Sequence, residues 1–324
     1  ISNTLTNGTA LTTVGSASAP GMLLLGTGAD YSTKNLSIST SAGFQGAVLI
    51  RGGTLTLTTT DTQAGIGLGG TGYGGLFLSS GTINTKRVDS LDGTTTSSIA
   101  VLQVSGGTLN TANYIMFRNE RWEFTVTGGQ VLRTGDAIAL GFRSGGSAAT
   151  ATTTAQGAMT MAGGVVNNSI YNITFGQQNN NTALGTAYLN LNAGTLINNQ
   201  IVHYGGDSTK TAGYRKGVLH FYHNTVVSHR TKTTVLFRPS TPEEKVECHG
   251  NILHVTAPGM KLSLMGGSGT LTMGKNWLTS GWVKAVEELK LELNTLEPSL
   301  EGKDPGFVSL EKLDLTLRPD SPCN

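Results

Sequence analysis

The sequence predicts an all-β protein, a single right-handed parallel β-helix (β-solenoid) with three short strands per rung and a C-terminal cap. Three observations predict it: a short motif recurs along the first two thirds of the chain, a further apolar run follows most copies, and glycine is abundant while charge is scarce. Of the 324 residues, 45 are glycine and 13% are charged. Repeats of about 20 to 50 residues are typical of solenoids, in which each unit packs only against its neighbours.

The recurring motif consists of two apolar runs joined by a glycine corner. One copy is AVLQVSGGTLNT at residues 100–111, and related copies occupy residues 47–57, 76–85, 123–134, 158–168 and 187–199. We interpret the glycines as corners that need a positive φ, because neither a helix nor a Lys-Ser/Thr pair follows them, as a phosphate loop requires. The second corner residues are Gly53, Gly81, Gly107, Gly129, Gly164 and Gly194.

Third strand candidates follow the corners at residues 64–70, 114–117, 137–142 and 172–177. Three short strands per turn give the triangular cross-section of a parallel β-helix. Alternation within a strand places Val101 and Gln103 on one face and Leu102 and Val104 on the other. The crossover preference of parallel strands makes the expected hand right.

Residues 1–200 are expected to form Gly/Thr/Asn-rich solenoid repeats that open with one or two irregular rungs. No polar amphipathic helix precedes these rungs, so we expect the N-terminal end of the core to be open or covered from outside the chain. Gln130 and Val165 interrupt a row of equivalent threonines, which we therefore interpret as strand formers rather than as a water-ordering ladder. The row consists of Thr54, Thr82, Thr108 and Thr195.

Residues 201–281 are expected to continue the β-helix around a ladder of asparagines. Asn199, Asn224, Asn251 and Asn276 each precede an apolar pair, directly or nearly so, at intervals of 25, 27 and 25 residues. Stacked at one corner, their amides can hydrogen-bond from rung to rung and tolerate a left-handed backbone. This ladder is interpreted as a structural device rather than as a row of catalytic amides.

Residues 282–324 are expected to form the capping segment. Val283, Val286 and Leu289 lie at helical spacing, whereas Leu289, Leu291 and Leu293 alternate as in a strand, so both structures remain open. The charged outer face of either one suits a cap over the last rung.

Composition excludes several classes of partner. A formal charge of +2 gives no electrostatic reason to expect nucleic acid or an anionic membrane. No apolar run has the length of a membrane span and no signal segment opens the chain, which we interpret as a mature or trimmed product. Spacing does not decide whether Cys248 and Cys323 are bridged.

Two parts of the chain resemble known sequence groups. The VSGGTLN-type units of the first 200 residues resemble the autotransporter-associated β-strand repeats of large bacterial exported proteins. From about residue 205 onward, GVLHFYHNTVVS, VECHGNILHV, GKNWLTSGW and the closing DPGFVSLEKLDLTLRPDSPCN resemble the right-handed parallel β-helix, or pectate-lyase-like, superfamily in its bacterial secreted form. Both resemblances imply one continuous right-handed solenoid.

Pectate-lyase-like enzymes act through clustered aspartates that bind calcium and an arginine base on the middle rungs. The acids in the middle rungs of this chain do not recur at the spacing of one rung, and no pair of carboxylates suited to hydrolysis is evident. We therefore assign no catalytic residue, no metal ligand and no cofactor; calcium stays open, although no motif supports it. The acids are Asp61, Asp89, Asp92, Glu120, Glu123 and Asp136.

The candidate ligand-binding residues all follow residue 200, as do all six histidines. His223 and His249 precede ladder asparagines, so neighbouring rungs can bring them together to share a metal ion or a proton, although ordinary corner histidines are the alternative. Exposed aromatic residues of this region can stack on sugars or serve the core. The candidates are His220, His223, His249, Arg238, Tyr222 and Trp277, with Glu243, Glu244, Tyr204, Tyr214 and Trp282 nearby.

Two functions are compatible with these patterns. The first is an extracellular or cell-surface structural or adhesive β-helix protein that assembles with itself or binds surface carbohydrate, for example as a filament subunit. The second is a polysaccharide lyase or hydrolase, or a carbohydrate-binding relative of such enzymes. The scarcity of clustered charge favours the first.

Overall fold

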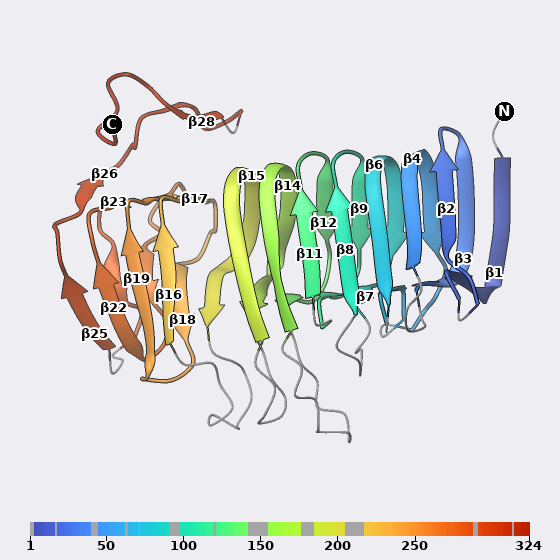
Figure 1. Ribbon diagram of the computed structural model, residues 1–324. Helices are drawn as coiled ribbons and strands as arrows, with labels where there is room; N and C mark the ends of the chain where they lie inside the picture. Colours follow the sequence, from blue (N-terminus) through green and yellow to red (C-terminus); the bar gives the residue numbers. More distant parts are fainter. Residues whose placement is uncertain are drawn as a thin grey trace. The chain divides into compact units, whose positions relative to one another are not determined.

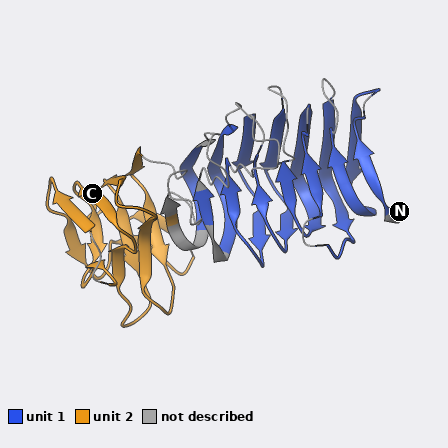
Figure 2. Cartoon of the chain, turned by 90° about the horizontal axis from the view of Figure 1, so that it is seen from below, with its two compact units in different colours: residues 1–199 blue, residues 200–324 orange. Residues whose placement is uncertain are grey.

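The protein is a parallel β-solenoid of about nine turns in a computed structural model (Figure 1). The structure describes residues 3–16, 18–39, 45–61, 64–70, 72–90, 98–118, 121–141, 155–175, 185–204, 217–287, 291–312 and 314–324. These residues form strands and no helix, which confirms the all-β solenoid predicted from the repeats. The chain divides into two compact units, residues 1–199 and 200–324 (Figure 2).

The first unit contains long strands that bend at the glycine corners and short strands that complete each rung. In β4 and β6 the two predicted apolar runs form one hydrogen-bonded strand. The strands are β1 Asn3–Val14, β2 Gly21–Gly26, β3 Ala29–Ile38, β4 Gln45–Leu57, β5 Ile66–Leu68, β6 Tyr73–Thr85, β7 Val88–Ser90, β8 Ile99–Val104, β9 Thr108–Thr111, β10 Ile115–Met116, β11 Arg121–Val126, β12 Gln130–Arg133, β13 Ile138–Leu140, β14 Ala155–Phe175 and β15 Gly185–Tyr204, which runs past the boundary.

Parallel pairing places equivalent residues of successive rungs side by side. Alternate residues of each strand point inward, as Leu102 and Val104 do in β8, and neighbouring rungs supply the same position again. The inward residues form fully buried ladders that remove aliphatic surface from water along the unit. One ladder runs through Val48, Leu76, Leu102, Phe124 and Met159, and another through Leu55, Ile83, Leu109, Val131 and Val166.

The glycine corners have the predicted positive φ, with one shift of position. Gly81, Gly107, Gly129, Gly164 and Gly194 all adopt it, but in the first copy the residue is Gly52 rather than Gly53. A Cβ added at Gly107 would lie 2.5 Å from the carbonyl oxygen of Gly81. The corner therefore needs glycine both for its backbone conformation and for the close approach of the neighbouring rung.

The predicted third strands correspond to β5, β10, β13 and the last part of β14, and β7 adds one more. A group of ion pairs lies beside these strands. Asp89 pairs with Arg87 at 2.5 Å and with Arg118 at 2.6 Å, and the three side chains are mostly buried. Asp89, one of the dispersed acids of the sequence, thus belongs to a structural network. Thr54, Thr82 and Thr108 lie in register and are followed by Gln130 and Val165, as predicted.

The second unit is built from three parallel sheets. They are β16–β19–β22–β25, β17–β20–β23–β26 and the run β18–β21–β24. The strands are β16 Gly217–Tyr222, β17 Thr225–Ser228, β18 Thr234–Pro239, β19 Glu244–His249, β20 Ile252–Val255, β21 Leu262–Met265, β22 Gly269–Met273, β23 Trp277–Thr279, β24 Val283–Ala285, β25 Leu291–Thr295, β26 Leu300–Gly302, β27 Phe307–Ser309 and β28 Asp314–Leu317.

In the segment where helix and strand were both open, the described residues 283–285 and 291–295 form strands, and Leu289 lies outside the described residues. β24, β25 and β26 pair in parallel with the preceding rung, so the first part of the predicted capping segment is one more rung. The chain then forms the antiparallel hairpin β27–β28. Phe307 of this hairpin is buried and its ring lies 6.2 Å from the ring of His254 on β20.

The asparagine ladder is present at three of its four predicted positions. The Asn224 Nδ2 donates to the Asn251 Oδ1 at 3.1 Å, and the Asn251 Nδ2 donates to the Asn276 Oδ1 at 2.8 Å. The side chain of Asn199 lies outside the described residues. The left-handed backbone that we assigned to the asparagines belongs instead to the residues before two of them, His223 with φ 54° and Gly250 with φ 67°.

Candidate functional site

An exposed array of aromatic, imidazole and carboxylate groups lies on the outward face of the sheet β16–β19–β22–β25. Alternation along β19 turns Val246 and Cys248 into the core and leaves Glu247 and His249 outside. Parallel register then sets Glu247 beside His220 and His249 beside Tyr222 of β16. Strand periodicity thus brings four groups of two rungs together, and His223 joins them from the corner after β16. We define the array as His220, Tyr222, His223, Glu247 and His249.

Hydrogen bonds fix the polar half of the array. The His220 Nδ1 lies 2.7 Å from the Tyr222 hydroxyl and 2.9 Å from the Glu247 Oε2. The Tyr222 hydroxyl donates a short hydrogen bond to the same carboxylate oxygen. His220 and Glu247 remain about half exposed, with side-chain exposed fractions of 57% and 42%. The groups are thus held in place while they stay open to solvent.

The titration of these groups follows from their contacts. Partial burial and the hydrogen bond to Glu247 raise the pKa of Tyr222 to about 12. The Tyr222 hydroxyl, followed by His220, lowers the pKa of Glu247 below its ordinary value. At neutral pH the carboxyl is therefore ionised and the phenol keeps its proton. A tyrosine that acts as a general base needs a lowered pKa, and a carboxyl group that acts as a general acid needs a raised pKa. The shifts of Tyr222 and Glu247 are the reverse of these.

Ring contacts organise the other half of the array. The rings of Tyr222 and His249 stack with centroids 3.7 Å apart, and His223 meets His249 edge to face at 5.5 Å. A Cβ on Gly250 would lie 2.4 Å from the His223 Nδ1, so His223 occupies space that only glycine leaves free. His223 also has a positive φ, which is uncommon for a residue with a side chain.

Four of the six predicted candidates lie in this array, and two do not. Arg238 is in β18, a strand of a different sheet. Trp277 is 3% exposed, and its ring packs edge to face on His254 at 5.6 Å. Glu244 is buried and accepts a hydrogen bond from the backbone amide of Thr241. Tyr204 and Tyr214 lie outside the residues whose side chains are described.

Sequence reasoning missed Glu247, although it accepts hydrogen bonds from the array. The available signal was its alternation with Cys248 in EKVECH, together with a register of 27 residues that pairs it with His220. Among the described residues no group of three or more His, Cys, Asp or Glu side chains is arranged to hold a metal ion. The described part of the chain also contains no helix long and apolar enough to cross a membrane.

The cysteines do not pair with each other. Cys248 is a buried free thiol and Cys323 is a partly exposed one. Burial raises the pKa of the Cys248 thiol to about 12, and the Asn251 amide opposes this shift. Cys248 therefore behaves as a small core residue next to the asparagine ladder.

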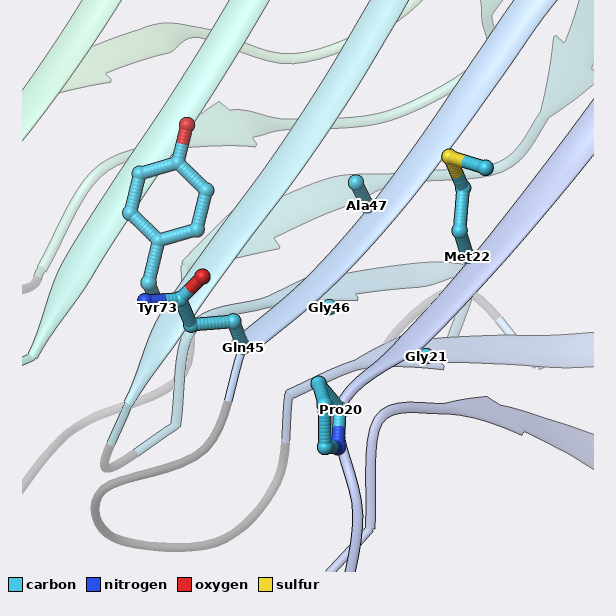
Figure 3. Close-up of a pocket in the computed structure, with 7 residues that line it drawn as sticks. All are labelled: Pro20, Gly21, Met22, Gln45, Gly46, Ala47 and Tyr73. Carbon is cyan, nitrogen blue, oxygen red and sulfur yellow. The ribbon is translucent and has the colours of Figure 1, made fainter.

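A hollow lies in the first unit, on the outward face of β2, β4 and β6 (Figure 3). It has a volume of about 270 Å³. Figure 3 shows Tyr73 and Gln45 on one side and Met22 on the other, with Ala47 between them. The lining residues are Pro20, Gly21, Met22, Gln45, Gly46, Ala47 and Tyr73.

Comparison of the whole chain with models of protein families, with curated proteins and with solved structures found no match.

Proposed function

We propose that the protein is an extracellular or cell-surface β-solenoid with a structural and adhesive role, and that the array on β16 and β19 is its main adhesive surface. The main observation behind this proposal is that hydrogen bonds and ring stacking hold four side chains of the array in place while they stay accessible to solvent. These side chains are His220, Tyr222, Glu247 and His249. Fixed, exposed aromatic and polar groups lower the ordering cost of binding. The resemblance to pectate-lyase-like proteins and to autotransporter repeats supports a carbohydrate partner and an exported location.

Carbohydrate suits the chemistry of the array. An ionised carboxylate and imidazole nitrogens can accept and donate hydrogen bonds to hydroxyl groups, and the Tyr222 and His249 rings offer apolar contact to a sugar. We favour binding over polysaccharide cleavage because the array contains a single carboxylate, Glu247, whereas glycoside hydrolysis ordinarily uses a pair of carboxyl groups. Incubation with neutral and acidic polysaccharides, with and without calcium, should leave their chain length unchanged.

Retention on immobilised polysaccharides tests the adhesive role. The wild-type protein should be retained on at least one polysaccharide of a neutral and acidic panel, and the double variant Tyr222→Ala/His249→Ala should not. Thr125→Ala, a change of a partly exposed residue on the outward face of β11, serves as the control and should be retained like the wild type. Equal retention of all three proteins, or none by the wild type, would refute the proposal.

Self-assembly is the second part of the proposed role, and it has its own support. β25 and β26 are the last strands of their sheets, and exposed apolar side chains flank them, with Leu296 73% and Val286 53% exposed. An open strand edge beside apolar residues is a template for another chain. Sedimentation over a concentration series should show association that Leu296→Lys weakens. Monomers at every concentration would contradict it.

A further inference from the structure

An aromatic platform occupies the outward face of the first unit, next to the hollow of Figure 3. Tyr73, Gly75 and Phe77 are alternate residues of β6 and share this face. A Cβ on Gly75 would lie 2.5 Å from the Phe77 ring and 3.3 Å from the Tyr73 ring. Both rings therefore lean over the glycine, one from each side, and cover the strand backbone.

Tyr73 of the platform forms one wall of the hollow, which we call the slot. Register aligns Met22 on β2 with Ala47 on β4 and Gly75 on β6, so the floor at Ala47 lies between Met22 and the two rings. Two strand spacings of about 4.8 Å separate β2 from β6. After allowance for the thickness of the walls, roughly 6 Å remains, which accommodates one ring. Met22 is 71% exposed, so its wall of the slot is open to solvent.

The polarity of the lining limits the ligand class. None of the seven described lining residues carries a charge, and the polar groups are the Gln45 amide and the Tyr73 hydroxyl. The floor of the slot has two glycines and an alanine, which let a ligand approach the backbone closely. Aromatic and methionine walls favour the apolar face of a ring, while an amide and a phenol suit hydroxyl groups at its edge.

We propose that this slot binds one neutral pyranose ring, which stacks on the Tyr73 ring that Phe77 and Gly75 hold in the platform, and which hydrogen-bonds to Gln45. The choice of a sugar rests on the proposed adhesive function, whereas the place and the shape of the slot do not. The slot then gives the first unit a carbohydrate subsite separate from the array on β16 and β19. The absence of charge on the described lining residues predicts preference for neutral sugars over uronic acids.

Saturation-transfer NMR tests the slot with the methyl glycosides of glucose, galactose, mannose, N-acetylglucosamine and glucuronic acid. We expect transfer to at least one neutral glycoside. Ala47→Leu fills the slot, and Gly75→Ala pushes the Phe77 ring out of place, so each should weaken binding by roughly tenfold. Val101→Leu, a smaller enlargement to the same residue type in the next strand of the row, is the control and should bind like the wild type.

The outcomes separate this proposal from the proposed function. No transfer to any neutral glycoside, stronger transfer to the glucuronide, or equal binding by Ala47→Leu and Val101→Leu would overturn it. Circular dichroism of each variant shows whether the solenoid is intact, and Gln45→Ala supplies a second binding test that leaves the slot floor unchanged. Loss of polysaccharide retention in Tyr222→Ala/His249→Ala with glycoside binding intact supports two separate sites.

Discussion

Asn251 joins three rungs of the second unit through one buried amide. Its Nδ2 donates to the carbonyl oxygens of Phe221 at 2.9 Å and His249 at 3.0 Å and to the Asn276 Oδ1 at 2.8 Å. Its Oδ1 accepts from the backbone amide of Asn224 at 2.8 Å. Because the side chain is 1% exposed, water cannot replace these partners when the amide is removed.

We therefore expect Asn251→Ala to lower the free energy of unfolding of the second unit by about 2–4 kcal/mol, since it strands several buried polar groups at once. Asn294→Ala removes an exposed amide from β25 and should change stability by less than about 0.5 kcal/mol. Urea denaturation of both variants and the wild type measures the difference. Equal midpoints for the two variants would show that the ladder contributes little.

The ladder and the array show what sequence can and cannot reveal about single residues. The asparagines were predictable because one residue type recurs at nearly constant intervals before an apolar pair. Glu247 was missed, because its partners lie 25 and 27 residues earlier and only the strand alternation combined with the rung register brings them together. Positive φ at His223 could not be read from the chain either, since the space it needs is created by Gly250 of the next rung.

The rungs were predictable as elements because the glycine corners and apolar runs repeat together. Strands with weaker signals were not. β7 was not among the predicted third strands, and the mixed periodicity of residues 283–293 left helix and strand open. Residues 283–285 and 291–295 form strands paired with β21 and β22, because an existing sheet edge satisfies the backbone groups of the next segment.

The corners give a prediction for whole strands. Gly107→Ala places a side chain at φ 72° and against the Gly81 carbonyl, so we expect a loss of at least about 2 kcal/mol in the free energy of unfolding of the first unit. Gly26→Ala is the matched control, because its added Cβ meets nothing within 4 Å. It should leave stability nearly unchanged. Thermal melting followed by circular dichroism compares them, and similar melting temperatures would contradict a strict glycine requirement.

We expect the stability of the second unit to depend on pH through His254, whose ring contacts Phe307 of the hairpin β27–β28. Burial lowers the pKa of His254 from its ordinary value of 6.5, His229 adds to the shift and Asp304 opposes it. The unfolded chain therefore binds more protons than the folded unit just below pH 6.5. Stability is fully present above that pH and falls as the pH drops through the lower folded pKa.

Denaturation midpoints measured between pH 8 and about pH 4.5 should decline for the wild type and stay flatter for His254→Gln. The Gly306 amide and Arg318 lower the pKa of Asp304, and its contribution is lost only as the pH falls below its ordinary value of 3.8. The two effects thus occupy different pH windows. A decline of equal size in His254→Gln would assign the acid sensitivity to another group.

At the scale of the whole molecule, a solenoid has the property that one complete rung can be removed without changing the pairing of the rest. Removal of residues 108–129 joins Gly107 to Gln130, which takes the place of Thr108 beside Thr82. Leu102 then meets Met159 and Ile83 meets Val131, so each ladder keeps an aliphatic neighbour. The ion pair between Arg87 and Asp89 also remains.

We expect this variant to fold with a β-sheet circular dichroism spectrum and to lose about 1–3 kcal/mol, the share of stability that 22 residues contribute in a linear array. A second variant lacks residues 107–129, one residue more than the first. This deletion removes the positive-φ glycine Gly107 and shifts the following strand by one position. Since side chains alternate, that shift turns Val131 outward and Leu132 inward, and the disturbance passes to every later rung. The second variant should therefore aggregate or melt far below the first. If both melt alike, the corners tolerate register errors and the rung is not the unit from which this protein is built.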